Sequence, residues 1–90
     1  MVASIRKDSV EAAKLFNDGE FFAVFIDADH SYEGVRKDID AWLPKVMPGG
    51  ILCGHDFDGM FPGVIQAVDE SFRDKFSVMG KCWVYRIPKK

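Results

Sequence analysis

The sequence has no apolar run longer than six residues, whereas a membrane-spanning helix needs about 20. Arg6, Lys7 and Asp8 interrupt any apolar stretch near the N-terminus, so we expect no signal peptide. A basic excess is also absent, because 12 Lys and Arg stand against 14 Asp and Glu and leave a net charge of −2. Nucleic-acid-binding surfaces usually carry a basic stripe. We therefore expect neither a nucleic acid nor a membrane as partner.

Cysteine is scarce. The only two, Cys53 and Cys82, each fall in a strand-like segment, and such a number does not indicate a disulfide-stapled secreted scaffold. We expect two free, buried thiols and a cytoplasmic location. In contrast, 48% of the residues are hydrophobic and eight are phenylalanine, which is typical of a folded globular chain. Ninety residues allow one small domain, spanning 1–90.

Hydrophobic periodicity and turn signals predict alternating strands and helices. Such alternation is typical of an α/β fold with mostly parallel strands and flanking helices, and the last two strands predict a C-terminal antiparallel β-hairpin. Trp42, Phe72 and Trp83 are expected in the core. The predicted elements are a short strand over 2–7, a helix from an Asp8-x-x-Glu11 capping box to about residue 17, a strand over 22–26, a helix capped by Ser31 and closed at Pro44, a strand over 50–54, a helix starting at Pro62, and hairpin strands over 76–79 and 82–87.

The most informative stretch is residues 21–32, FFAVFIDADHSY. Six apolar residues end abruptly in Asp27, Asp29 and His30, and a second apolar segment ends at Gly54, just before His55 and Asp56. Continuous apolar runs are typical of strands buried on both faces. Open α/β sheets bind their ligands just beyond the carboxyl ends of such strands. These acidic and imidazole side chains are therefore the candidates for a functional site.

Two segments carry a family resemblance: residues 25–34, FIDADHSYEG, and residues 43–56, LPKVMPGGILCGHD. They resemble the C-terminal half of a class I S-adenosylmethionine-dependent methyltransferase, and within that fold the small-molecule, metal-dependent O-methyltransferase-like group. The resemblance covers almost the whole chain. It implies a truncated Rossmann-like methyltransferase sheet, S-adenosylmethionine as a weakly bound cofactor, and methyl transfer to a small-molecule hydroxyl.

The resemblance also implies roles for single residues. Asp27, His55 and Asp56 match the positions that bind a divalent metal, and His30 matches the general base that deprotonates the acceptor hydroxyl. Asp8 and Ser9 match positions beside the adenine of the cofactor. Where this chain has His55, the family usually has a carboxylate. Because imidazole is a softer ligand than carboxylate, the expected ion, Mg²⁺ or Mn²⁺, shifts toward Mn²⁺ or other transition metals.

Part of the family pattern is missing. The chain has no Gly-x-Gly-like loop between a strand and a helix, so it lacks the family's N-terminal glycine-rich cofactor loop. The family sheet also places its first and second strands between the third and the fourth. The strand predicted over residues 2–7 must therefore pair directly with residues 22–26, pair with another copy, or stay loose. An unpaired strand edge favours association, so we expect a homo-oligomer, with strand exchange as one form.

Purely structural roles remain open for the candidate residues. Asp27 could cap the next turn, His30 could hydrogen-bond the backbone, and His55 with Asp56 could form a turn without metal. Three functions follow. The first is a methyltransferase-like protein whose site is completed by another chain, the isolated chain being inactive. The others are a non-catalytic, self-associating α/β module and a metal-binding module without transfer chemistry.

Overall fold

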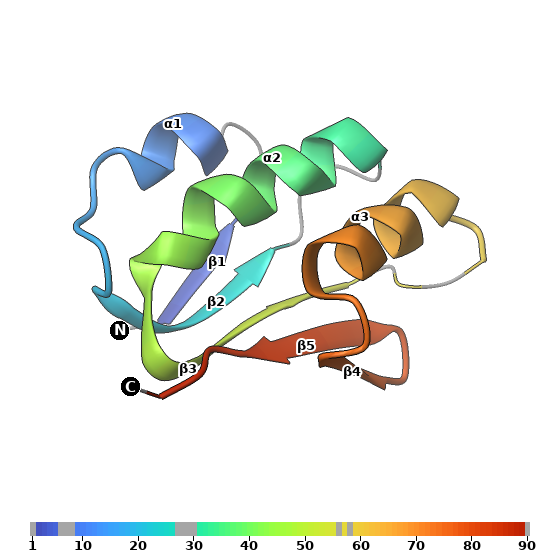
Figure 1. Cartoon of the computed structure of the whole chain (residues 1–90). Coiled ribbons are helices and arrows are strands. Elements are labelled where there is room, and N and C mark those ends of the chain that lie inside the picture. Colours follow the sequence, from blue (N-terminus) through green and yellow to red (C-terminus); the bar gives the residue numbers. More distant parts are fainter. Residues whose placement is uncertain (1, 6–8, 27–30, 56, 58, 90) are drawn as a thin grey trace.

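The computed structural model describes residues 2–5, 9–26, 31–55, 57 and 59–89. Strands and helices alternate along the chain and end in a hairpin, so the predicted α/β class is confirmed (Figure 1). The strands are β1 (Val2–Ile5), β2 (Phe21–Ile26), β3 (Val46–Gly54), β4 (Phe76–Met79) and β5 (Cys82–Arg86). The helices are α1 (Ser9–Ala13), α2 (Tyr32–Trp42) and α3 (Pro62–Phe72), and a short 3₁₀ turn (Leu43–Lys45) follows α2.

The strands form one sheet in the order β1-β2-β3-β5-β4. β1, β2 and β3 are parallel, β5 is antiparallel to β3, and β4 completes the hairpin. β1 pairs directly with β2 of its own chain, Val2 opposite Ala23 and Ile5 opposite Ile26. Of the three arrangements considered for this strand, the structure shows the intrachain one. β1 therefore lies beside β2, where the family resemblance places a different strand.

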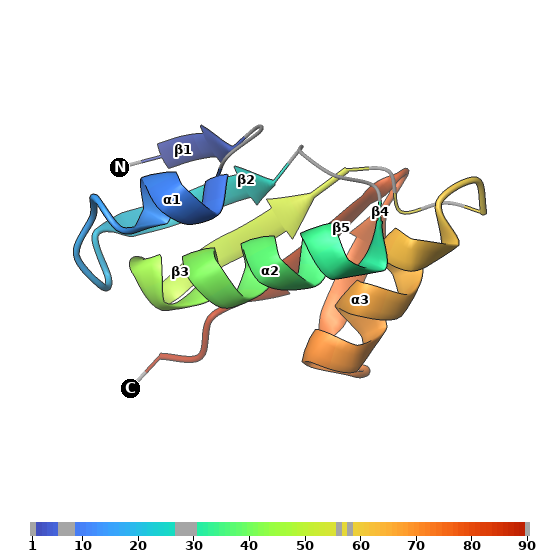
Figure 2. The same ribbon diagram turned by 90° about the horizontal axis from the view of Figure 1, so that it is seen from above.

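All three helices lie on the same face of the sheet (Figures 1 and 2). Alternate strand residues face them, and Val24, Leu52 and Trp83 are at most 1% exposed. From the helices, Trp42 and Phe72 complete this core, as predicted. No helix in the described part of the chain is long and apolar enough to cross a membrane.

Two element boundaries differ from the prediction by four residues. α1 ends at Ala13 rather than near residue 17, because the next residues form i to i+3 turns, such as the bond from Leu15 N–H to the Ala12 carbonyl. β3 starts at Val46, four residues early. Pro48 and Gly49 are residues that usually interrupt a strand. Here the strand continues through them, with a register shift against β2 and a φ of 85° at Gly49.

The two cysteines are free, as predicted, but they are only half-buried. Both lie on strands beside a residue that faces the helices, since Cys53 follows Leu52 and Cys82 precedes Trp83. Successive strand residues point to opposite faces of the sheet, so both thiols point away from the helices. The expectation of buried thiols was therefore wrong in degree. The prediction assumed that both faces of the sheet are covered.

Candidate functional site

The carboxyl ends of the three parallel strands lie side by side. Ile5 is paired with Ile26, and Ile26 is paired with Gly54. β1, β2 and β3 therefore end at one edge of the sheet. This is the edge where open α/β sheets bind ligands. The register places the ends of β2 and β3, after which the two Asp- and His-bearing segments begin, next to each other, and a shared site stays a prediction.

The predicted site residues are described only in part. His55 follows Gly54 directly and is exposed, and Ser9 is the first residue of α1. Asp8, Asp27, His30 and Asp56 lie outside the described residues, as does Asp29. Among the residues that the structure does describe, no three His, Cys, Asp or Glu side chains are grouped as metal ligands. The metal, base and adenine assignments therefore stay predictions.

The strand end that carries His55 is fixed by a close contact between Gly54 and Trp83. The two residues are paired across β3 and β5, and a Cβ on Gly54 would lie 2.5 Å from Nε1 of Trp83. Trp83 is 1% exposed and packs against Phe72 of α3, with ring centroids 5.7 Å apart. Only glycine leaves room for the indole at this position. The hairpin therefore sets the position from which His55 leaves the sheet.

Ser31 begins the helix that follows the 27–30 segment. Its backbone is extended, and its Oγ accepts a hydrogen bond from the Gly34 N–H at 3.1 Å. This is the geometry of an N-cap, and it satisfies one of the free N–H groups of the first turn. The predicted cap is confirmed. Because Ser31 fills this position, α2 does not require Asp27 as a cap.

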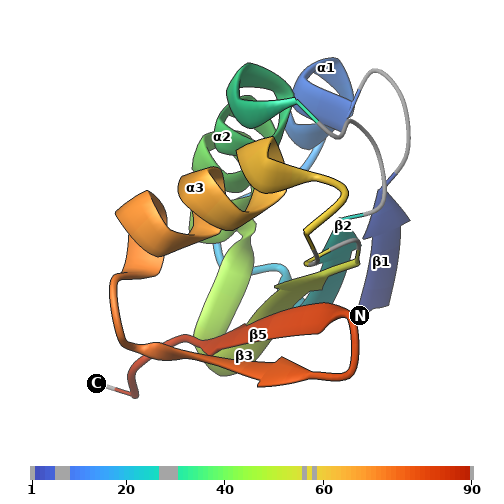
Figure 3. The same cartoon turned by 90° about the vertical axis from the view of Figure 1, so that its right-hand side faces the viewer.

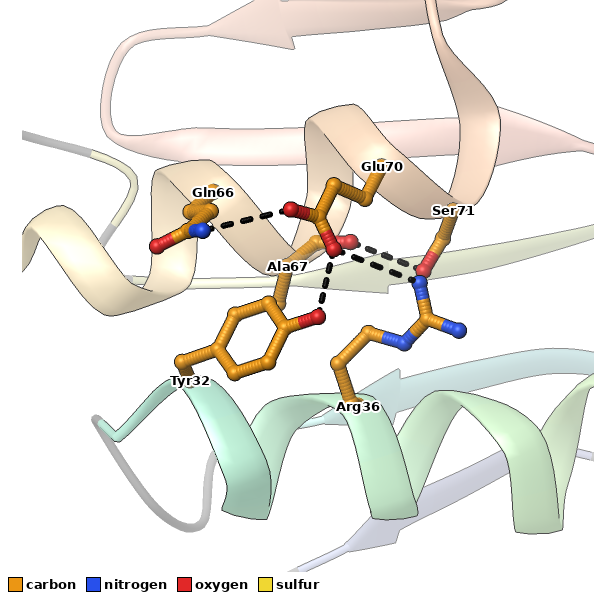
Figure 4. A network of polar contacts seen from close by, with 6 residues as sticks. All are labelled: Tyr32, Arg36, Gln66, Ala67, Glu70 and Ser71. Atoms are coloured by element: carbon orange, nitrogen blue, oxygen red, sulfur yellow. Dashed lines mark hydrogen bonds and ion pairs between the residues drawn. The ribbon is translucent and has the colours of Figure 1, made fainter.

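A polar cluster on the exposed surface joins α2 to α3 (Figure 4). The Tyr32 hydroxyl donates a hydrogen bond to Glu70, and Gln66 Nε2 donates one to Glu70 Oε2 at 3.2 Å. Arg36 Nη1 lies 4.0 Å from Glu70 Oε1. Tyr32 is the first residue of α2 and comes just after Ser31. The cluster therefore anchors the helix start next to the candidate site.

Sequence reasoning missed this cluster. Tyr32 with Arg36 and Gln66 with Glu70 each have the i, i+4 spacing that places two side chains on one side of a helix. That spacing was the available signal. It could not show that α2 and α3 lie next to each other, which is a property of the sheet order.

The hydrogen bond between Tyr32 and Glu70 shifts the pKa values of both side chains. It is the main reason that the pKa of Glu70 is lowered, and the bond from Gln66 adds to this effect. The same bond is the main reason that the pKa of Tyr32 is raised. The cluster therefore holds Glu70 as a carboxylate and Tyr32 as a neutral phenol.

We expect Glu70 to make the free energy of unfolding depend on pH in the acid range. A carboxyl with a lowered pKa in the folded state stabilises the fold above its unfolded pKa, about 4.3, and the contribution is lost as the pH falls. Between about pH 6 and about pH 3, Tm should therefore fall further for the wild type than for Glu70→Gln. Thermal unfolding followed by circular dichroism measures this difference. Glu33→Gln, at an exposed position of α2 outside the cluster, should follow the wild type; parallel curves for wild type and Glu70→Gln would contradict the prediction.

The structure is a Rossmann-like α/β domain in which the carboxyl ends of β1, β2 and β3 lie at one edge of the sheet. Residues 1–57, more than half of the chain, match a family model described as a methyltransferase domain. The chain therefore belongs to this methyltransferase domain family, and it shares its fold with the methyltransferase MycE.

Solved structures of similar fold align with nearly the whole chain. A crystal structure of a Corynebacterium glutamicum protein aligns with a TM-score of 0.69 and 18% identity, over 91% of this chain and 45% of that one. MycE, a methyltransferase of mycinamycin biosynthesis crystallised with Mg and SAH, aligns with a TM-score of 0.64 and 19% identity, over 89% of this chain and 28% of its own. At these identities the likeness shows the fold alone.

One curated relative is similar in sequence. The uncharacterized protein y4gI of Sinorhizobium fredii is 31% identical over 52 residues, which are 58% of this chain and 6% of that protein. The chain therefore spans a small fraction of this relative and less than half of the solved structures. More than half of each of these proteins has no counterpart in the ninety residues.

Proposed function

We propose that the chain forms part of an S-adenosylmethionine-dependent methyltransferase that methylates the hydroxyl oxygen of a small molecule, with the cofactor site completed by another chain. One observation carries the proposal. The family match covers residues 1–57 and so includes all six candidate residues, from Asp8 to Asp56. The aligned strand ends support it, since Ile26 and Gly54, which precede the two candidate segments, are paired neighbours.

The candidate residues have chemistry that suits this reaction. Two carboxylates and one imidazole, from Asp27, Asp56 and His55, form a donor set suited to Mn²⁺ as well as Mg²⁺. Such an ion, when bound, lowers the pKa of a ligated hydroxyl and orients it. In this proposal the His30 imidazole accepts the hydroxyl proton, which is a task for a group that titrates near neutrality.

The cofactor side is incomplete within the ninety residues. The first glycine in the chain is Gly19, so no glycine lies between β1 and α1. Asp8 and Ser9 could contact the adenine end alone. A second copy of this chain has no glycine loop either, so completion requires a polypeptide segment of different sequence. Because β1 occupies the place beside β2, strands of that segment must displace β1 or add to its outer edge.

The metal prediction can be tested on the chain itself. Mn²⁺ at about 100 times its Kd should stabilise the wild type by about 2.7 kcal/mol, seen as a rise in Tm. Asp27→Ala should remove the shift, whereas Asp40→Ala, at an exposed position of α2, should keep it. The electron paramagnetic resonance signal of Mn²⁺ gives a second readout. If Mn²⁺ leaves the Tm of the wild type unchanged, metal-assisted transfer is rejected.

Calorimetric titration with S-adenosylhomocysteine tests the need for completion. The chain alone should give no saturable heat up to about millimolar ligand, because small-ligand affinity requires most of the ligand surface to be enclosed. Micromolar binding by the ninety residues alone would contradict the proposed incompleteness.

A second candidate function is a non-catalytic, self-associating α/β module. Its specific support is the sheet face that no helix of the described chain covers. This candidate predicts a defined oligomer with neither a metal response nor cofactor affinity.

A further inference from the structure

A groove hollows the sheet at the amino ends of the parallel strands, at the opposite end of the sheet from the candidate site. It has a volume of about 350 Å³, and its lining comes from β2, the first half of β3, β5 and the chain that follows β5. Ile51 lines it and precedes Leu52, whose side chain faces the helices. Ile51 and its cross-strand partner Arg86 therefore point away from the helices, which stand on one side of the sheet in Figure 3. The groove opens on that uncovered face.

The register shift between β2 and β3 creates the groove. Between the pairs Phe21–Val46 and Ala23–Ile51, β2 has a single residue and β3 has a stretch of four. Surplus residues of this kind bend a strand locally and interrupt its pairing. The single residue of β2 is Phe22, whose side chain lines the groove and is 52% exposed. An aromatic ring is therefore left open to solvent beside the bulged part of β3.

The floor of the groove is fixed by backbone contacts on both sides. Toward the chain after β5, the Gly49 N–H donates a hydrogen bond to the Ile87 carbonyl at 3.0 Å, and the Ile87 N–H donates one to the Gly50 carbonyl at 2.8 Å. Toward β2, a Cβ on Gly50 would lie 2.6 Å from the carbonyl oxygen of Phe22, so the two backbones are in close contact. The groove is therefore preformed, as binding sites for small molecules usually are.

Two cations border the groove. Arg86 Nη1 lies 3.4 Å from the carbonyl oxygen of Gly49, and the stem of Lys89 crosses the same glycine, because a Cβ there would lie 3.2 Å from Cγ and Cε of Lys89. In the described part of the chain, no Asp or Glu lines the groove and none forms an ion pair with either cation. The chain as a whole has a net charge of −2, so this positive surface is a local feature. Its charge complements an anion.

The rest of the lining is apolar. Phe22, Met47 and Ile51 face the groove, so an occupant meets aromatic and aliphatic surface beside the two cations. A guanidinium group can donate two parallel hydrogen bonds to a carboxylate, and an aromatic ring packs well against another ring. The volume lies at the small end of the range of roughly 300–1,000 Å³ typical of small-molecule sites. This combination favours a compact ligand with a carboxylate at one end and a ring at the other.

We propose that this groove binds a small aromatic carboxylate. The carboxylate pairs with Arg86 and Lys89, and the ring packs on Phe22 and Ile51. A protein partner is less well matched, because a standard interface buries about 800 Å² on each side and the cations lie within one compact groove. The site is separate from the candidate methyltransferase site, since His55 leaves the sheet at the carboxyl ends of the strands.

Titration with 2-naphthoate, followed by ¹H–¹⁵N correlation spectra, tests the proposal. The amide signals of Gly49, Gly50 and Ile87 should shift, and that of His55 should not. The expected Kd is about 0.1–1 mM, which is ordinary for a ligand of this size in a half-open site. 2-Naphthamide has nearly the same shape without the charge, and it should bind about tenfold more weakly, because its interaction with the two cations is lost.

Substitutions separate the contributions of charge and ring. Arg86→Gln should weaken naphthoate binding about fivefold and Lys89→Gln about twofold, since exposed ion pairs are individually modest. Phe22→Ala should weaken it about fivefold through loss of the ring contact. Lys37→Gln removes a cation at an exposed position of α2, on the helical side, and is the matched control that should bind as the wild type does. Because all four positions are exposed, circular dichroism should show the wild-type spectrum for each variant.

Several outcomes would overturn the proposal. One is the absence of any shift up to about 10 mM naphthoate, ten times the weakest expected Kd. Another is equal binding of naphthoate and naphthamide, or an equal effect of Lys37→Gln and Arg86→Gln. If the Gly49 and Gly50 signals of ligand-free protein move on dilution, a second copy occupies the groove. If a tetraglutamate peptide binds more tightly than naphthoate, the occupant is an acidic protein segment. Binding here needs neither metal nor cofactor, so its failure leaves the proposed function untouched, and the reverse also holds.

Discussion

Replacing Trp83 with alanine is expected to lower the free energy of unfolding by about 3–5 kcal/mol. Trp83 is 1% exposed, packs against Phe72, and is paired with Gly54 on one side and Val78 on the other. Its removal leaves a cavity between α3 and the sheet and loosens the hairpin from β3. Because small domains are stable by only about 5–15 kcal/mol, this loss is a large share of the total. Urea unfolding followed by far-ultraviolet circular dichroism measures it.

Met79→Ala is the matched control for this prediction. Met79 lies on the same hairpin but is 70% exposed, so its truncation should change the free energy of unfolding by less than about 0.5 kcal/mol. Trp42 remains as a fluorescent probe in both variants. A loss below about 1 kcal/mol for Trp83→Ala would mean that the hairpin does not contribute to the core as the structure shows.

Gly54→Ala should destabilise the protein by about 1–3 kcal/mol through overpacking. The new methyl would lie 2.5 Å from Nε1 and 2.7 Å from Cε2 of Trp83, so the buried indole or the strand must shift. Since His55 follows Gly54, the same shift moves the strand end at the candidate site. We expect chemical-shift changes at the His55 imidazole that accompany the loss of stability.

A double-mutant cycle identifies the cause. In a Trp83→Leu background the indole is absent, so adding the methyl at Gly54 should have little further effect. Gly59→Ala is the control, because a Cβ there meets no atom within 4 Å. Additive effects of Gly54→Ala and Trp83→Leu would show that the methyl clashes with something other than the indole.

Much of the fold follows from local sequence patterns. The six apolar residues of 21–26 and the cap at Ser31 define a strand and a helix without reference to the rest of the chain. The turn at Gly80 likewise defines the hairpin, since its φ of 63° suits glycine. The start of β3 was missed for the opposite reason. Pro48 and Gly49 are locally typical of a break, and only pairing with β2 keeps them in the strand.

The sequence predicted where in the fold the candidate site lies, but not how its side chains are arranged. Asp27 and His55 were identified because they follow apolar runs, and the register between Ile26 and Gly54 shows that the two runs end side by side. The cluster around Glu70 was not predicted, because it joins residues up to 38 positions apart on two helices. Such contacts depend on the order of strands in the sheet.

The sequence by itself determined the class of fold, the order of its elements, the capping of α2 and the family to which the chain belongs. These features depend on spacing along the chain, where neighbouring residues constrain one another. Only the tertiary structure decided that β1 pairs with β2, that Trp83 packs against Gly54, and that all three helices cover the same face. The reason is physical: an apolar run shows that a strand must be buried, but the packing of the whole chain decides which of its faces is covered, and by what.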